Sequence, residues 1–274
     1  GAKKGSKESV SKKFISVGSS ISEPSFTPYL HYDGRKIKII ASPVGTSPDL
    51  IANLVKSKTV ETQIQKIKEG TKKGRKLILS ASRVDYTKGN EELLLAFERL
   101  LEKRKDLHGE IVLMMACVSA TSGMKIYKET QRAIEEIVGR INGKFSLIDW
   151  VPIRLSTKRI PYEELVAWFT QADICWITPL RDGLNLVAKE YVAARKGKPG
   201  VLVLSEFTGA SVMLNGAILT NPYSQNKMDA SINEAISMSL EEQLERIEMM
   251  TSAVESFTVQ DWAEEQIKSI DLYS

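Results

Sequence analysis

The chain has 274 residues, a net charge of +4 at pH 7 and 26% charged residues. Its basic residues are mixed with acidic ones, which argues against a nucleic-acid-binding protein, because such proteins need a denser basic face with aromatic platforms. No apolar run approaches the roughly 18 residues of a membrane span and no signal peptide is visible, so we expect a cytoplasmic protein without a membrane partner.

From residue 36 onwards, apolar runs of strand length alternate with helical patterns. Strands are predicted at 36–41, 76–81, 110–117, 146–151, 173–178, 200–205 and 217–219. Helices are predicted at about 48–69, 90–103, 124–140, 161–171, 184–196, 226–238, 240–255 and 258–271. Strands that alternate with helices favour an α/β domain built on a parallel, doubly wound sheet.

The first segment with chemical character runs from residue 77 to 101. Here the apolar run LILSAS precedes a loop and an amphipathic helical pattern, 90–101. Arg83 and Lys88 flank the turn that ends at Gly89. An arginine can bind a diphosphate as a fork and a lysine as a point charge, and both stand where open α/β sheets bind ligands. The alternative is two solvated surface cations.

The second segment is TPLRDGLNLVAKE, residues 178–190. Asp182 and Gly183 form a turn after an apolar run, and a helical pattern starts at Leu184. Such a helix N-terminus presents unpaired N–H groups and suits an anion. Glu190 lies about six residues further, or roughly 9 Å along the helix, which is a suitable reach from a diphosphate to a ribose. The alternative is an ordinary Asp-Gly turn and N-cap.

Metal and redox chemistry are not indicated. Cys117 and Cys175 lie in apolar runs, as buried free thiols do in a reducing compartment. His31 and His108 are far apart in the sequence. We therefore expect no metal site and no cofactor.

Several long motifs in the same order resemble the trehalose-6-phosphate synthase family of retaining glucosyltransferases. The similarity runs from about Arg35 to the C-terminus. The motifs are RVDYTKG (83–89), GRINGKFSLIDWVPI (139–153), RDGLNLVAKEY (181–191), PGVLVLSEFTGAS (199–211) and NPYSQNKMDASINEAISMSLEEQ (221–243).

The resemblance implies a GT-B architecture, in which two Rossmann-like domains face a cleft and the C-terminal one holds the sugar nucleotide. Residues 1–46 would be a remnant of the N-terminal acceptor domain with the crossover, and 36–41 its last strand. Residues 47–256 would form the nucleotide-sugar-binding domain. Residues 257–274 would form a helix that crosses back. The chain would then be the donor-binding part of a longer enzyme.

The resemblance also implies roles for individual residues. Arg83 and Lys88 would bind the donor diphosphate and act in catalysis, Asp182 would hold sugar hydroxyls, and Glu190 would hold the ribose. The base pocket would be lined by the segment 150–154, mainly through backbone groups. The remaining donor contacts would be Ile153, Gly183, Leu184, Asn185, Leu186 and Val187.

The expected acceptor site departs from the family pattern. Trehalose-6-phosphate synthases carry an arginine in a TSRG-type segment that contacts the phosphate of glucose 6-phosphate, whereas this chain has Thr121-Ser122-Gly123. Glycine cannot replace a phosphate-binding arginine without moving the anion or its donors. A branch of the family that transfers glucose from ADP-glucose to glycerol 3-phosphate, for osmoprotectant synthesis, shares this change. Ser122, Gly123 and Lys125 are candidate acceptor contacts.

Two other functions stay open. One is a trehalose-6-phosphate synthase that uses UDP-glucose and glucose 6-phosphate with a rearranged acceptor loop. The other is a nucleotide-sugar-binding module without catalysis. The sequence decides neither the base of the donor, ADP-glucose or UDP-glucose, nor the oligomeric state.

Overall fold

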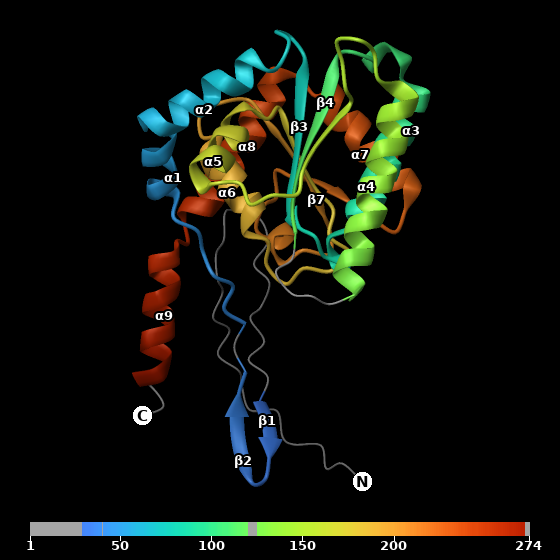
Figure 1. The fold of residues 1–274 in the computed structure, drawn as a ribbon. Helices are drawn as coiled ribbons and strands as arrows, with labels where there is room; N and C mark the ends of the chain where they lie inside the picture. Colours follow the sequence, from blue (N-terminus) through green and yellow to red (C-terminus); the bar gives the residue numbers. More distant parts are fainter. Residues whose placement is uncertain (1–28, 40, 120–124, 272–274) are drawn as a thin grey trace.

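The computed structural model describes residues 29–39, 41–119 and 125–271, and a six-stranded parallel sheet forms its centre (Figure 1). In spatial order the strands are β5 (Ile153–Ser156), β4 (Ile111–Val118), β3 (Lys76–Arg83), β6 (Ile174–Ile177), β7 (Val201–Ser205) and β8 (Ile218–Thr220). The strand order changes direction between β3 and β6, and this switch point is where doubly wound sheets bind ligands. The predicted α/β class with a doubly wound parallel sheet is confirmed.

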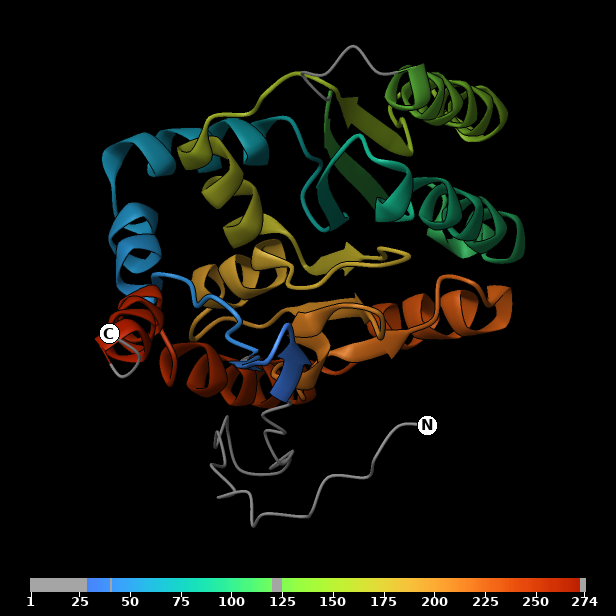
Figure 2. The same cartoon turned by 90° about the horizontal axis from the view of Figure 1, so that it is seen from below.

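Helices cover both faces of the sheet, which explains why its strands read as continuous apolar runs. All residues of β7 and all but the last of β4 are buried. On one side lie α1 (Pro48–Val55), α2 (Lys58–Glu69), α5 (Tyr162–Gln171), α6 (Leu186–Ala194) and α8 (Leu240–Glu255) (Figures 1 and 2). On the other side lie α3 (Asn90–Lys103), α4 (Lys125–Phe145) and α7 (Gln225–Ser237).

A two-stranded hairpin and a final helix lie outside this sandwich. The strands β1 (Tyr29–Tyr32) and β2 (Arg35–Lys38) pair antiparallel. They are joined by Asp33-Gly34, where both residues have positive φ, as the tightest hairpin turns require. The predicted strand 36–41 is therefore partly formed, in β2, and residue 40 lies outside the described part of the chain.

The segment before α1 pairs with the segment that leads into α9 (Val259–Asp271). Thr46 and Thr258 form a parallel bridge, and the N–H of Val259 donates to Thr46 O at 2.9 Å. Further along, Trp262 Nε1 donates to Ser42 O at 3.1 Å. The segments around 42–46 and 258–262, more than 200 positions apart in the sequence, are thus held side by side.

The predicted strand at 146–151 is wrong. Leu147 and Trp150 form an isolated antiparallel bridge across a turn, and the strand follows at β5. The apolar character of this stretch comes from Trp150, which is 1% exposed and donates its Nε1 hydrogen to Ile111 O at 2.6 Å. The apolar run therefore combines the buried side chain of Trp150 with an exposed turn, in which Ile148 is fully exposed.

Two predicted helices have different limits. The pattern 48–69 is interrupted between α1 and α2, where Ser57 caps α2 by accepting the N–H of Val60. The pattern from Leu184 starts as a helix only at Leu186, because Asn185 has φ 69° and serves as the N-cap.

The loops after β3 and β6 touch at Gly89. This residue has φ 64°, and a Cβ placed on it would lie 1.9 Å from Thr178 O. The Oγ1 hydroxyl of Thr178 donates in return to Gly89 O at 3.0 Å. A side chain at position 89 would therefore separate the two loops at the switch point.

We expect Gly89→Ala to lower the free energy of unfolding by at least about 2 kcal/mol, because it combines left-handed backbone strain with a backbone clash. Gly139→Ala in α4 is the matched control: its Cβ would meet nothing within 4 Å, so alanine should raise stability by about 0.5–1 kcal/mol. Urea denaturation of both variants measures these changes. Equal stability of the two variants would contradict the close approach at Gly89.

Candidate functional site

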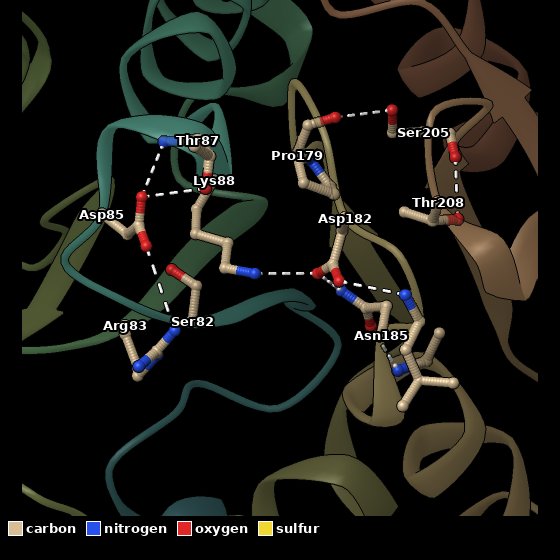
Figure 3. A network of polar contacts seen from close by, with 12 residues as sticks. Ser82, Arg83, Asp85, Thr87, Lys88, Pro179, Asp182, Asn185, Ser205 and Thr208 are labelled. Atoms are coloured by element: carbon tan, nitrogen blue, oxygen red, sulfur yellow. Dashed lines mark hydrogen bonds and ion pairs between the residues drawn. The ribbon is translucent and has the colours of Figure 1, made fainter. Parts of the chain in front are cut away.

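The site is built from two loops that meet at the switch point of the sheet. After β3, a short 3-10 helix η2 (Tyr86–Lys88) is capped by Asp85, whose Oδ1 accepts hydrogen bonds from both the N–H and the hydroxyl of Thr87. After β6, the N–H of Leu180 donates to Thr87 O at 2.8 Å. These bonds fix the direction in which Lys88 leaves its loop (Figure 3).

Lys88 and Asp182, from the two loops, form an ion pair with 2.8 Å between Nζ and Oδ2 (Figure 3). Both side chains are largely buried, with 19% and 14% of their surfaces exposed. Asp182 also accepts hydrogen bonds from the N–H of Leu184 and from Asn185 Nδ2. Burial acts to raise the pKa of Asp182, but these bonds outweigh it and leave the pKa below its usual value. The carboxylate is thus held ionised.

A third loop, after β7, supports the turn that carries Asp182. The N–H of Asp182 donates to Phe207 O at 3.1 Å, and Gly209 N–H donates to Asp182 O at 2.9 Å. A Cβ on Gly209 would lie 2.2 Å from Gly183 O, so this contact also requires glycine. The hydroxyl of Ser205 donates to Pro179 O at 2.7 Å (Figure 3). Sequence reasoning missed this support, although the glycine in SEFTGAS was its available signal.

The start of α6 faces the same site. Asn185 Oδ1 accepts the N–H of Ala188 at 3.0 Å. Leu186 and Val187 are the first two helical residues, whose N–H groups have no partner within the helix. Gly183 has no positive φ, and a Cβ on it would meet nothing within 4 Å. Its missing side chain therefore leaves space beside the ion pair, which a ligand could use.

Arg83 lies at the end of β3 and is brought to the same edge of the sheet. Its side chain is 74% exposed, and Nη2 stands 3.9 Å from Asp85 Oδ2 (Figure 3). This is too long for a hydrogen bond. The guanidinium is therefore available to an anion in solvent.

Glu190, in the middle of α6, accepts a hydrogen bond from Tyr162 of α5, with 3.1 Å between the hydroxyl and Oε1. Burial raises the pKa of Glu190, and this hydrogen bond opposes the rise. Tyr162 also lines a hollow of about 410 Å³, together with Arg159, Ile160, Pro161 and Leu165. Sequence reasoning assigned no ligand contact to the residues that line this hollow, which adjoins the Tyr162–Glu190 contact through Tyr162.

Ile153 does not join these residues. It is 2% exposed and pairs with Leu113, five positions before the end of β4. Its backbone N–H and C=O both bond the side-chain amide of Asn142, each at 3.0 Å. The side chain of Asn142 thus already bonds both backbone groups, although the carbonyl oxygen keeps a second lone pair. A donor contact at Ile153 stays a prediction.

Of the three candidate acceptor residues, only Lys125 lies within the described part of the chain. Ser122 and Gly123 lie outside the described residues. Lys125 is the first residue of α4, has a side chain that is 89% exposed, and forms an ion pair with Glu129 at 3.5 Å. It is not brought against Lys88 or Asp182 by any contact within the described chain.

Metal ligands, membrane spans and reactive thiols would each indicate a different chemistry. Within 29–39, 41–119 and 125–271, no three His, Cys, Asp or Glu side chains gather as metal ligands do. In the same ranges no helix is both long and apolar enough to cross a membrane. Cys117 and Cys175 are buried and free, and burial raises the pKa of each thiol, that of Cys117 to about 11.

Known proteins with similar sequences include synthases of two kinds, glucosylglycerol-phosphate synthases and α,α-trehalose-phosphate synthases. The chain is 48% identical over 254 residues to the glucosylglycerol-phosphate synthase of Synechocystis, which covers 93% of this chain and 51% of that protein. It is 50% identical to the enzyme of the same name from Picosynechococcus, over 85% of this chain and 47% of that protein. The chain thus spans about half the length of the curated relatives it matches.

Solved structures agree with the fold. The α,α-trehalose-phosphate synthase (UDP-forming) from Burkholderia xenovorans, in complex with glucose 6-phosphate, superposes with a TM-score of 0.86 at 36% identity, covering 91% of this chain and 55% of that one. The E. coli trehalose-6-phosphate structure bound with UDP-2-fluoro glucose gives 0.82 at 33% identity, covering 89% and 55%. The model of glycosyltransferase family 20 matches residues 6–272, and the chain belongs to that family.

Proposed function

We propose that this chain is the nucleotide-sugar-binding half of a retaining glucosyltransferase that transfers glucose from ADP-glucose to glycerol 3-phosphate. The observation that carries the proposal is the Lys88–Asp182 pair at the switch point of the sheet. It joins a cation for phosphate to a carboxylate for sugar hydroxyls, in a place where such sheets bind ligands. The 48% and 50% identities to glucosylglycerol-phosphate synthases support this acceptor.

In this proposal the donor diphosphate lies over the start of α6. Lys88 Nζ has three hydrogens and gives one to Asp182, so it can bind a phosphate oxygen without leaving the carboxylate. Arg83 adds a second cation, and backbone groups of 183–187 surround the phosphates and sugar. Asp182 holds glucose hydroxyls, Glu190 holds the ribose, and the base enters the hollow beside Tyr162.

The proposed chemistry needs charge stabilisation at one end of the breaking bond. The bond from the glucose anomeric carbon to the diphosphate breaks, and the acceptor oxygen bonds that carbon on the same face. Negative charge develops on the leaving diphosphate, where Arg83, Lys88 and the N–H groups of α6 are directed. Such preorganised donors commonly contribute more to catalysis than any other effect. The leaving phosphate takes the proton of the acceptor hydroxyl, so no nucleophilic carboxylate is required.

The domain limits belong to the same proposal. Residues 1–46 would belong to the acceptor side with the crossover, 47–256 to the nucleotide-sugar-binding domain, and 257–274 to the helix that returns. The pairing of Thr46 with Thr258, and of Ser42 with Trp262, supports the two crossings as neighbours. The acceptor itself would be bound mostly by the half of the enzyme that the curated relatives have in addition.

A second candidate is a trehalose-6-phosphate synthase that uses UDP-glucose. It is favoured by identities of 36% to the S. cerevisiae α,α-trehalose-phosphate synthase 56 kDa subunit and to the B. xenovorans structure. Against it stands Thr121-Ser122-Gly123, which lacks the phosphate-binding arginine of that group. A binding module without catalysis is disfavoured because the chain belongs to glycosyltransferase family 20 and its similar proteins include named synthases.

Calorimetric titration of this chain should show saturable binding of ADP-glucose in preference to UDP-glucose. Lys88→Ala should weaken that binding at least about tenfold, because a hydrogen bond to a charged group contributes about 1.5–3 kcal/mol. Lys72→Ala, at an exposed lysine 4.0 Å from Asp149, is the control and should bind as the unsubstituted chain does. Preference for UDP-glucose would favour the second candidate, and binding of neither nucleotide sugar would contradict an autonomous donor site.

Gly183→Ala should leave stability within about 0.5 kcal/mol of the original, since the added methyl meets no protein atom within 4 Å. ADP-glucose affinity should nevertheless fall several-fold, because the methyl occupies the space proposed for the ligand. Thermal unfolding and titration are measured on the same sample, with Gly143→Ala in α4 as control. Unchanged affinity would mean that the donor does not pass Gly183.

In the complete enzyme, glycerol 3-phosphate should be converted with a higher kcat/KM than glucose 6-phosphate. Lys88→Ala should reduce kcat by about 10²–10³, the loss typical for removal of one preorganised donor. Product formation with each acceptor is followed by release of the nucleoside diphosphate. Faster turnover of glucose 6-phosphate would refute the proposed acceptor, and unchanged kcat in Lys88→Ala would refute the role of the lysine.

A further inference from the structure

The contact between Tyr162 and Glu190 joins two parts of the site that the sequence separates by 28 positions. Tyr162 is the first residue of α5 and Glu190 the fifth of α6, and the two helices pack against each other. The tyrosine hydroxyl donates to Glu190 Oε1 at 3.1 Å. Within the described part of the chain, the hydroxyl makes no second hydrogen bond and Oε2 receives none.

The hydrogen bond from Tyr162 favours the charged state of the Glu190 carboxylate. Burial raises the pKa of Glu190, which works against the charged form that a ribose hydroxyl would need as acceptor. The hydrogen bond from Tyr162 lowers the pKa and works for that form. A phenol has few rotatable bonds, so it also holds the flexible glutamate in one orientation at little entropic cost.

The position of Tyr162 adds a second function to the same side chain. Tyr162 lines the hollow formed with Arg159, Ile160, Pro161 and Leu165, while its hydroxyl reaches Glu190 on α6. The residue therefore stands between the hollow proposed for the base and the carboxylate proposed for the ribose. Base and ribose are adjacent in a nucleotide, so a single residue at this boundary can set their relative placement.

We propose that Tyr162 is a positioning residue for the nucleotide donor, whose hydroxyl holds Glu190 Oε1 so that Oε2 faces the ribose hydroxyls. This inference rests on the proposed function and deepens it, because it assigns recognition of ribose, as opposed to a sugar without those hydroxyls, to a pair of residues. Tyr162 acts through Glu190 and not on the diphosphate or the glucose.

The test compares two nucleotides on the unsubstituted chain and on variants at Tyr162, Tyr32 and Glu190 by calorimetric titration. The nucleotides are ADP and 2′,3′-dideoxy-ADP, which lacks the hydroxyls that Glu190 would bind. Tyr162→Phe removes only the hydroxyl and keeps the ring. Tyr32→Phe, at an exposed tyrosine of the hairpin that projects away from the sheet (Figure 1), is the matched control.

We expect Tyr162→Phe to weaken ADP binding about three- to tenfold, which is the usual net contribution of one hydrogen bond. The unsubstituted chain and Tyr162→Phe should bind 2′,3′-dideoxy-ADP equally well. Tyr32→Phe should change the binding of neither nucleotide. In a Glu190→Ala background, Tyr162→Phe should have no further effect on ADP. A role confined to folding or packing would not separate the two nucleotides in this way.

Three results would overturn the inference. Equal weakening for both nucleotides would mean that Tyr162 serves the base or the fold and not the ribose. Unchanged binding of both would mean that the hydroxyl positions nothing, while the proposed donor site would stand. Failure of the unsubstituted chain to bind ADP at all would instead remove the proposed donor site, and the inference with it.

Discussion

The site depends on how closely the loops after β3 and β6 approach at the switch point of the sheet. Gly89 allows that approach, because any Cβ there would meet Thr178 O at 1.9 Å. The backbone contact brings Lys88 and Asp182, 94 positions apart, within 2.8 Å. Without it, the cation and the carboxylate would be two separate surface charges on the same edge of the sheet.

The Lys88–Asp182 pair can bind a further charged or polar group because its side chains are only partly buried. A fully buried pair loses much of its attraction to the cost of desolvation, and an exposed pair is weakened by solvent and salt. Here the carboxylate is also held by Leu184 and Asn185, so it stays ionised while the ammonium retains hydrogens for another anion. The electrostatic arrangement is therefore in place before a ligand arrives.

Asn185 connects this electrostatic centre to the rest of the proposed nucleotide site. Its positive φ, which is unfavourable for a residue other than glycine, turns the chain into α6 while its side chain bonds both Asp182 and the N–H of Ala188. The helix then carries Glu190 to Tyr162, at the hollow lined by α5. One helix thus links the proposed phosphate end of the site to its proposed nucleoside end.

The sequence by itself determined the alternation of strands and helices and the candidate residues at strand ends, because apolar periodicity and turn chemistry are local. Only the tertiary structure decided that Lys88 meets Asp182 and that Tyr162 meets Glu190, since these contacts depend on strand order and helix packing. For the same reason, the apolar run at 146–151 reflects the docking of Trp150 and not a strand, and the backbone groups of Ile153 are already bonded by Asn142. Local pattern predicts which segments are buried, whereas the fold decides which groups remain free to bind.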